Sequence, residues 1–247
     1  HPDVSLLVVT GGPGVVKQAL QSGKKVIGAG AGNPPAFVDE TADIKKAAQD
    51  IVLGASLDNN ILCIAEKSVV AMRQIEPQLV QEMVKAGCIL VENQQDIQRL
   101  VDLTVLPNGT PNKKFVGKNA SVILDAAHIP YNGDPRLIIM RAPKNHPFAV
   151  IEMLMPILPV VTVDSFDEGL DVCLMLEAGL HHTATMHSLN MERLNRMARK
   201  MKTSIFVKNG PSYAGLGFSG EGTTTFTIAT PTGESTTSAR CFARRRR

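Results

Sequence analysis

Several features that would place the 247-residue chain in a specialised class are missing from its sequence. It has no tryptophan, only 2 tyrosines, and 4% aromatic residues in all. No stretch reaches the roughly 18 to 20 uninterrupted apolar residues that a membrane helix needs, and no basic-apolar-small signal segment opens the chain. We therefore expect a cytoplasmic protein that does not act at a membrane.

Cysteine and histidine are also sparse, and their spacing argues against two kinds of site. The four cysteines form no CxxC pair, and the six histidines include no HExxH sequence. A disulfide scaffold and a zinc site both need such spacings. The sequence predicts reduced thiols and no bound metal.

Basic charge is concentrated at one end of the chain. The net charge of +3 would become −1 without the four arginines at positions 244–247. With no other basic block, nucleic-acid binding is not predicted, and we interpret the arginines as a solvated strand end or a subunit contact. The chain starts at His1 rather than methionine, and we expect both of its ends to be cuts through a longer protein.

Apolar and helical segments alternate along most of the chain. The pattern predicts strands at 4–10, 25–30, 36–39, 68–72, 136–142, 183–188 and 204–209, and helices at 13–23, 41–56, 76–87, 96–105, 119–129, 166–179 and 190–201. Thr41 is the expected N-cap of the second helix. Strands separated by helices indicate right-handed βαβ units and a mostly parallel sheet. From position 211, glycine, serine and threonine predict a loop followed by an extended arm.

Cys63 is the cysteine that packing explains least easily. Cys173 lies on an apolar helix face and Cys88 opens an apolar run, so burial accounts for both. Cys63 instead follows Asn59 and Asn60, whose amides could donate to a developing oxyanion, as could the backbone N–H of Cys63 itself. Because free cysteine is among the most buried residue types, core packing and nucleophilic catalysis both remain open at this point.

A glycine pair marks a candidate dinucleotide site. Gly11 and Gly12 connect the first predicted strand to a helix that begins near Pro13. Glycine backbone can approach a phosphate or ribose closely, and a helix N-terminus favours negative charge. A tight strand-helix turn without a ligand is the equally open alternative.

The order of these motifs resembles the aldehyde dehydrogenase superfamily. The resemblance begins with "VVTGGPGVV", "VIGAGAGNPPAFVDETAD" and "DNNILCIAEK", and continues through "EMLMPILPVVTVDSFDEGL", "HTATMHSLN" and "SIFVKNG". It covers essentially the whole chain, which corresponds to about the C-terminal half of a family member. The resemblance implies a three-layer αβα fold with a mostly parallel sheet. Positions 1–32 would end the dinucleotide-binding domain, 33–210 would form the catalytic domain, and 211–247 would form a loop and an oligomerisation arm that adds a strand to a neighbouring subunit.

Within that superfamily, "LCIAEKSVV", "HPFAVIEMLMPILPV", "HTATMHS" and "GEGTTTFTIATPTGE" are most similar to the CoA-acylating enzymes of bacterial microcompartments for propanediol or ethanolamine utilization. This implies conversion of propanal or acetaldehyde, NAD and coenzyme A to acyl-CoA and NADH, with Cys63 as nucleophile. His146 is a candidate acid/base helper, with an ordinary surface-loop histidine as the alternative. The implied cofactor-binding residues are Gly11, Gly12, Gly30, Ala31, Pro156 and Ile157.

Two departures from hydrolytic members favour the CoA-acylating branch. The glycine-rich stretch at 27–33 has no carboxylate to activate water, so a thioester would persist. Leu154 and Met155 stand beside Pro156 where hydrolytic relatives carry a glutamate that holds the nicotinamide ribose, although a methionine there is also ordinary core filling.

The resemblance also sets the expected partners and leaves two alternatives. It implies a homo-oligomer in a microcompartment lumen, in contact with shell or lumen proteins. A hydrolytic NAD-dependent dehydrogenase, or an inactive fragment without the N-terminal cofactor-binding half, remains open. The sequence does not decide between acetaldehyde and propanal, or between NAD and NADP.

Overall fold

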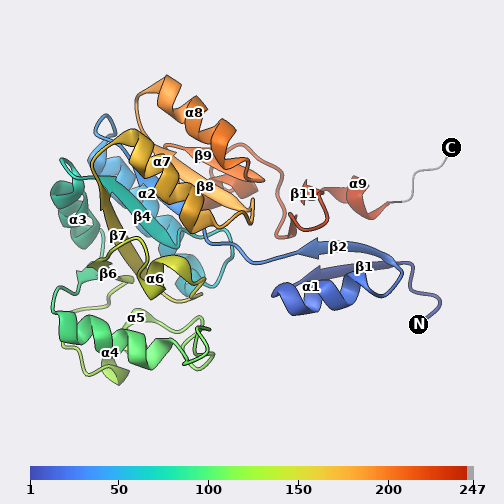
Figure 1. The fold of residues 1–247 in the computed structure, drawn as a ribbon, viewed down its shortest axis with the longest axis horizontal. Coiled ribbons are helices and arrows are strands. Elements are labelled where there is room, and N and C mark those ends of the chain that lie inside the picture. The colour runs from blue at the N-terminus through green and yellow to red at the C-terminus, as the bar shows by residue number, and fades with distance from the viewer. Residues whose placement is uncertain (244–247) are drawn as a thin grey trace.

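A seven-stranded sheet organises most of the chain in the computed structural model, which describes residues 1–243 (Figure 1). Neighbouring strands all run parallel, in the order β5-β6-β7-β4-β3-β8-β9. The strands are β3 (Pro35–Val38), β4 (Ser68–Met72), β5 (Cys88–Leu90), β6 (Leu137–Arg141), β7 (Ile157–Val163), β8 (Thr183–His187) and β9 (Ile205–Lys208). The expected parallel α/β architecture is confirmed. The arginines at 244–247 lie outside the described residues.

Helices cover both faces of this sheet. They are α2 (Ile44–Ser56), α3 (Glu76–Lys85), α4 (Gln94–Thr104), α5 (Ala120–Ala126), α6 (Pro147–Val150), α7 (Phe166–Glu177) and α8 (Met191–Met201). Right-handed crossovers place α2 and α3 on one face and α7 and α8 on the other, because the strand order moves in opposite directions from β3 and from β7. The contacts agree, since α2 packs on α3 and α7 packs on α8, β3 and β4. The result is three αβα layers.

The sheet interior is apolar and closely packed. Phe37 on β3 is fully buried and stacks on Phe166, with 5.7 Å between ring centroids. A side chain at Gly169 on α7 would overlap the Phe37 ring, so the absence of a Cβ there allows the helix to approach the strand. Burying one large apolar side chain contributes roughly 1.5 to 3 kcal/mol. The sheet is therefore a rigid frame for the loops at its edges.

The start of α2 corrects one expectation. Asp43, not Thr41, is the N-cap, and its carboxylate accepts a hydrogen bond from the Lys46 amide. The Thr41 hydroxyl instead donates to the Asp39 carboxylate at 2.6 Å. Thr41 therefore stabilises the turn that leaves β3, and the helix begins two residues later than the pattern suggested.

Two strands of the seven-stranded sheet, β5 and β7, are not predicted from the sequence. β5 is only three residues long, and β7 contains Pro159, which lacks the N–H that a central strand normally uses. In the structure, Pro159 pairs opposite Met140 while β7 occupies the middle of the sheet between β6 and β4. The segment that the resemblance linked to cofactor binding is thus also a central core strand.

A smaller unit extends from the sheet domain (Figure 1). It contains the parallel pair β1 (Leu6–Thr10) and β2 (Lys25–Ala29), joined by α1 (Pro13–Leu20). This confirms the expected strand-turn-helix.

The C-terminal arm lies beside this smaller unit. It contains the 3-10 turn η2 (Ser212–Leu216), the antiparallel hairpin β10 (Ile228–Ala229) and β11 (Ser235–Thr236), and α9 (Ala239–Phe242). The Gly28 amide donates to the Thr232 hydroxyl at 3.0 Å, and Lys25 Nζ donates to the Cys241 carbonyl at 3.0 Å. The arm is thus fixed to β2 of its own chain. Strand addition to a neighbouring subunit stays a prediction.

No helix within residues 1–243 is both long enough and apolar enough to cross a membrane.

Candidate functional site

The amino ends of four parallel strands bring the polar groups of one wall together. Gly32 precedes β3, Cys63 precedes β4, Glu152 precedes β7 and His182 precedes β8. Because the strands run in one direction, these residues meet at the same edge of the sheet. The site therefore differs from the common α/β arrangement, in which ligands bind at the carboxyl ends of the strands.

The opposite wall comes from the smaller unit, and a pocket of about 340 Å³ lies between the two. The carboxyl end of β1 contributes Thr10 and the arm contributes Phe226. Five of the residues predicted from the sequence line this pocket together, namely Gly11, Gly12, Gly30, Ala31 and Cys63. The fold thus joins segments of the predicted cofactor domain and catalytic domain around one cysteine.

The other three predicted residues lie outside the lining of this pocket. His146 caps the short helix α6, accepting from the Phe148 amide at 3.2 Å, and burial lowers the pKa of its imidazole. The Pro156 carbonyl accepts from the Ile138 amide at 2.8 Å, and Ile157 is a buried residue of β7. These contacts are structural, and the expected roles of the three residues in binding or catalysis stay predictions.

Backbone before Cys63 has an unusual conformation. Asp58, Asn59 and Asn60 are consecutive residues with φ values of +49°, +53° and +64°. This left-handed region is costly for most residues, but asparagine and aspartate tolerate it because their side chains bond locally.

The asparagine side chains of this segment do not provide the expected oxyanion donors. Asn59 Nδ2 donates to the Gly117 carbonyl and to Asn119 Oδ1, and Asn60 Nδ2 donates to the carbonyls of Ala55 and Glu66. Both amide groups are therefore occupied in holding the loop. The backbone N–H of Cys63, which the sequence analysis also named, is still a candidate donor.

Charged groups around Cys63 act on its thiol in opposite directions. Burial raises the pKa of the Cys63 thiol, and the nearby Glu152 carboxylate raises it further. The Lys67 ammonium opposes this, as do the backbone amides of Cys63 and Ile64. The reactivity of the cysteine therefore depends on the balance between the half-buried Glu152 carboxylate and the buried Lys67 ammonium.

Glu152 brings a carboxylate to the glycine-rich stretch from a distant part of the chain. Although residues 27–33 contain none, Glu152 Oε1 accepts a hydrogen bond from the Gly32 amide at 3.0 Å, and Glu152 lines the pocket with Cys63. Its position, two residues before Leu154, also means that this segment does bring a carboxylate to the site. Burial raises the pKa of Glu152.

His182 is a second group that the sequence analysis did not select. It is fully buried, and burial together with the Lys67 charge lowers the pKa of its imidazole to about 4. Its Nδ1 lies 2.9 Å from the Thr183 hydroxyl, whereas Nε2 finds no hydrogen-bond partner among residues 1–243. A Cβ on Gly32 would lie 2.7 Å from the Cys63 carbonyl oxygen and 2.8 Å from His182 Cγ. Glycine at position 32 is what allows these two segments to meet.

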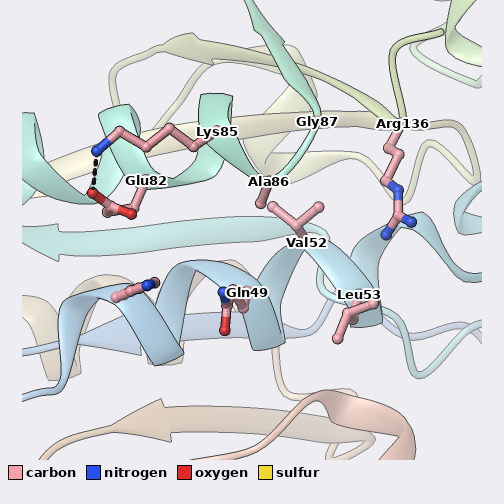
Figure 2. Close-up of a pocket in the computed structure, with 9 residues that line it drawn as sticks. Gln49, Val52, Leu53, Glu82, Lys85, Ala86, Gly87 and Arg136 are labelled. Carbon is pink, nitrogen blue, oxygen red and sulfur yellow. Dashed lines mark hydrogen bonds and ion pairs between the residues drawn. The ribbon is translucent and has the colours of Figure 1, made fainter.

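A second hollow, of about 580 Å³, lies between α2 and α3 (Figure 2). Lys85 and Arg136 reach its rim, and Lys85 pairs with Glu82 on the same helix at 2.6 Å. It contains no cysteine or histidine among the residues that line it, and both of these basic residues are exposed to solvent. Its chemistry does not resemble that of the pocket at Cys63.

Comparison with known proteins identifies the class. The sequence profile of the aldehyde dehydrogenase family matches residues 1–230, and the chain belongs to this family. The chain is 56% identical over 248 residues to propanal dehydrogenase (CoA-propanoylating) of Citrobacter freundii, covering 100% of this chain and 53% of that protein. It is 48% identical over 253 residues to an acetylating acetaldehyde dehydrogenase of Salmonella typhimurium, covering 100% of this chain and 54% of that protein.

Solved structures give the same result. The propionaldehyde dehydrogenase of Rhodopseudomonas palustris, solved with bound CoA and an acylated cysteine, is 50% identical and superposes with a TM-score of 0.97. A propionaldehyde dehydrogenase from the fucose utilisation microcompartment of Clostridium phytofermentans is 48% identical, with a TM-score of 0.96. Both alignments cover 100% of this chain and 56% of the other. The chain spans about half the length of the relatives that it matches.

Proposed function

We propose that the complete protein is a CoA-acylating aldehyde dehydrogenase. It would oxidise a short aliphatic aldehyde with NAD and pass the acyl group to coenzyme A through a thioester on Cys63. The observation that carries the proposal is that Cys63 lines one pocket together with the Gly11–Gly12 turn and Glu152. The relatives with CoA-propanoylating and acetylating names support it.

The glycine turn is suited to a dinucleotide. A Cβ on Gly12 would meet no heavy atom within 4 Å, so the backbone at the start of α1 is open to an incoming group. The Gly11 amide donates to the Ala29 carbonyl at 3.1 Å, but the open backbone at Gly12 and the N-terminus of α1 favour a phosphate or a ribose hydroxyl. When bound, NAD supplies the hydride acceptor. The residues that would hold it are Gly11, Gly12, Gly30 and Ala31.

The chemistry of Cys63 follows in two stages. The thiolate attacks the aldehyde carbonyl carbon, and loss of the hydride converts the resulting thiohemiacetal into a thioester. The CoA thiol, after losing its proton, then attacks the thioester carbonyl and releases the Cys63 thiolate. His182 lies close to Gly32, as the Cys63 carbonyl does, but it is outside the pocket lining and its pKa is lowered to about 4, which makes it a weak acceptor for that proton.

Glu152 is the observation that favours a second candidate, a hydrolytic dehydrogenase. A carboxylate beside the nucleophile can activate water against a thioester. Here one of its oxygens is engaged by the Gly32 amide, and burial raises its pKa. If Glu152 did activate water, a Glu152→Gln variant would lose acid production while the wild type made acid without CoA.

The first test is NADH formation from propanal by the complete protein, with and without CoA, for the wild type and Cys63→Ala. We expect strict CoA dependence in the wild type and loss of activity by at least about a thousandfold in the variant, because the nucleophile is removed. Equal rates without CoA, with release of propanoate, would refute the CoA-acylating assignment. Full activity of Cys63→Ala would refute the nucleophile.

Three finer proposals accompany this function. Propanal is the proposed substrate, because identity to the CoA-propanoylating relative is higher than to the acetylating one. Since one methylene changes the binding free energy by only about 1 to 3 kcal/mol, the ratio of kcat/KM for propanal and acetaldehyde is the measurement that decides.

The microcompartment origin of one structural relative supports a location in a microcompartment lumen. The hairpin arm supports a homo-oligomer, which light scattering would test.

The inactive-fragment alternative applies to residues 1–247 as an isolated polypeptide. A titration of this chain with NAD separates the possibilities. Saturable binding would show that the smaller unit and the sheet domain suffice for the cofactor. Absence of binding, together with activity of the complete protein, would assign the missing contacts to the rest of the protein.

A further inference from the structure

Lys67 is a buried ammonium with an unusual set of partners. Its side chain is almost fully inaccessible, with an exposed fraction of 2% for the residue. Nζ donates to the Asn60 carbonyl at 2.7 Å, to Asn60 Oδ1 at 2.7 Å and to the Leu62 carbonyl at 2.9 Å. No carboxylate of the described residues forms an ion pair with it. Three neutral oxygens, all just before Cys63 in the chain, thus satisfy the three N–H donors of the ammonium.

These hydrogen bonds hold the nucleophile segment from both sides. Asn60 is left-handed and buried, and its Nδ2 donates to Ala55 at the end of α2 and to the Glu66 carbonyl next to Lys67. Lys67 itself is fixed to the sheet, since its backbone amide donates to the Pro34 carbonyl at 2.8 Å. The turn that presents Cys63 is therefore bound to the start of β4 by one lysine side chain.

The charge of Lys67 is not neutralised by these contacts. The titratable groups that act on it are Glu152, Cys63 and Glu66, in decreasing order, and it acts in turn on His182. Desolvation lowers the pKa of its ammonium to about 8, while the neighbouring acidic groups favour the charged form. Glu66 is itself occupied by the Ser212 amide and hydroxyl, both at 2.8 Å. A cation without an ion-pair partner among residues 1–243 therefore lies in a low-dielectric region near Cys63, where its charge partly offsets the effects of burial and of Glu152 on the thiol.

We propose that Lys67 is the positioning residue of the nucleophile, which fixes the backbone of residues 60–62 and supplies the buried positive charge that favours the Cys63 thiolate. This inference rests on the proposed role of Cys63. Glu152 acts in the opposite sense, because its negative charge disfavours the thiolate. The two residues thus set the ionisation of the thiol between them.

The test measures the pH dependence of Cys63 alkylation by iodoacetamide in the complete protein, from about pH 6 to about pH 11. Alkylation of a Cys63→Ala variant gives the background from other thiols, chiefly Cys241, which is partly exposed. In Lys67→Met we expect the midpoint of the pH–rate curve to rise by at least about one pH unit, with a loss of about tenfold in rate near neutral pH. In Lys67→Arg, which keeps the charge, we expect a midpoint near that of the wild type.

Two further variants separate charge from packing. Glu152→Gln removes the opposing charge and should lower the midpoint, a direction that a loosened structure would not produce. Asn60→Asp places a carboxylate next to Lys67 Nζ and neutralises the ammonium charge by forming an ion pair. We expect this variant to raise the midpoint of Cys63 alkylation. Because Lys67 is retained, the test stays valid if Lys67→Met does not fold. Hydrogen exchange of the amides of residues 60–62 should accelerate in Lys67→Met but not in Glu152→Gln.

A wild-type midpoint in both the Lys67→Met and the Asn60→Asp variants would overturn the proposal. The thiol midpoint is read without turnover, so this result is independent of whether Cys63→Ala loses NADH formation. Failure of the Lys67 inference and failure of the catalytic assignment are therefore distinguishable.

Discussion

The interior of the seven-stranded sheet and the segment that precedes β4 are adjacent in the chain but are built differently. In β3 and β4 every residue is buried, and parallel ladders join them to their neighbours. Residues 57–67 contain three consecutive left-handed residues and two fully buried charged groups, Glu66 and Lys67. Such a conformation costs roughly 1 to 2 kcal/mol per residue for ordinary side chains, and burying charges costs more. The packing of the sheet therefore stabilises residues 57–67 in a conformation that this segment would not adopt alone.

The largest effect is expected from a substitution that destabilises the core of the sheet and leaves the ionisation of Cys63 unchanged. Leu158 on the central strand β7 is fully buried in the main apolar cluster. Leu158→Ala should lower the free energy of unfolding by about 2 to 5 kcal/mol, because it removes apolar contacts and leaves a cavity. Urea denaturation measures this loss. The pH midpoint of Cys63 alkylation should not move, and a shift of that midpoint would show that the two regions are not independent.

The second prediction concerns the buried Glu66, whose pKa is raised from 4.5 to about 7 by desolvation. Because the folded state binds this proton more tightly, the associated stability is complete below about pH 4.5 and is lost as the pH rises through about 7. Glu66→Gln does not titrate, so its stability relative to the wild type should rise by up to about 3 kcal/mol between about pH 5 and pH 8. Urea titrations of both proteins at the two pH values measure this, and an equal difference in unfolding free energy at about pH 5 and about pH 8 would show that Glu66 does not titrate in this way.

The third prediction concerns the close approach at Gly32. A Cβ there would collide with the Cys63 carbonyl and the His182 ring, so Gly32→Ala should displace the nucleophile segment. We expect kcat/KM to fall by about 10- to 100-fold, since small misplacements near reacting groups are costly. Gly210→Ala is the control, because a Cβ at position 210 would first meet the Val207 side chain at 3.3 Å and Gly210 does not line the pocket. Equal loss in both variants would contradict the steric explanation.

The smallest effect is expected at a helix end far from the pocket. Asp43→Ala removes the N-cap of α2, whose carboxylate accepts from the Lys46 amide at 3.0 Å. We expect this change to lower the free energy of unfolding by about 1 kcal/mol, which a lower midpoint of thermal unfolding would show. Asp171→Ala, at an exposed position within α7, should change stability by less than about 0.5 kcal/mol. Similar losses in the two variants would argue against the cap.

Much of the fold could be predicted because its signals are local. The helix that begins at Pro13, the strand at 68–72 and the helix that begins at Phe166 all follow from hydrophobic periodicity and end signals. β7 could not, because Pro159 argues against a central strand and only the three-dimensional arrangement shows that its neighbours tolerate it. The cap of α2 was misplaced by two residues, since Thr41 and Asp43 are both good caps and tertiary contacts decide between them.

Part of the site could be predicted, because some of its residues also have local signals in the sequence. Cys63 and the Gly11–Gly12 turn have recognisable sequence contexts, and the pocket joins them. Glu152, Lys67 and His182 were missed because their importance comes from long-range contacts and burial, which no spacing in the sequence reveals. The one available signal was a Glu-Lys pair within an apolar stretch, shortly after the cysteine, since buried charges in such a context require a specific partner.

The direction of the sheet has an electrostatic consequence for the cysteine. Strands that present their amino ends to a site also bring the C-terminal ends of the preceding helices there, and these ends carry partial negative charge from unpaired carbonyls. Two buried asparagine amides cap them, since Asn60 donates to Ala55 of α2 and Asn33 donates to Leu176 of α7, at 2.7 Å and 2.8 Å. A pocket built this way repels anions unless the helix dipoles are compensated. The Asn33 and Asn60 amides therefore reduce the negative potential that the ends of α2 and α7 impose on the Cys63 thiolate.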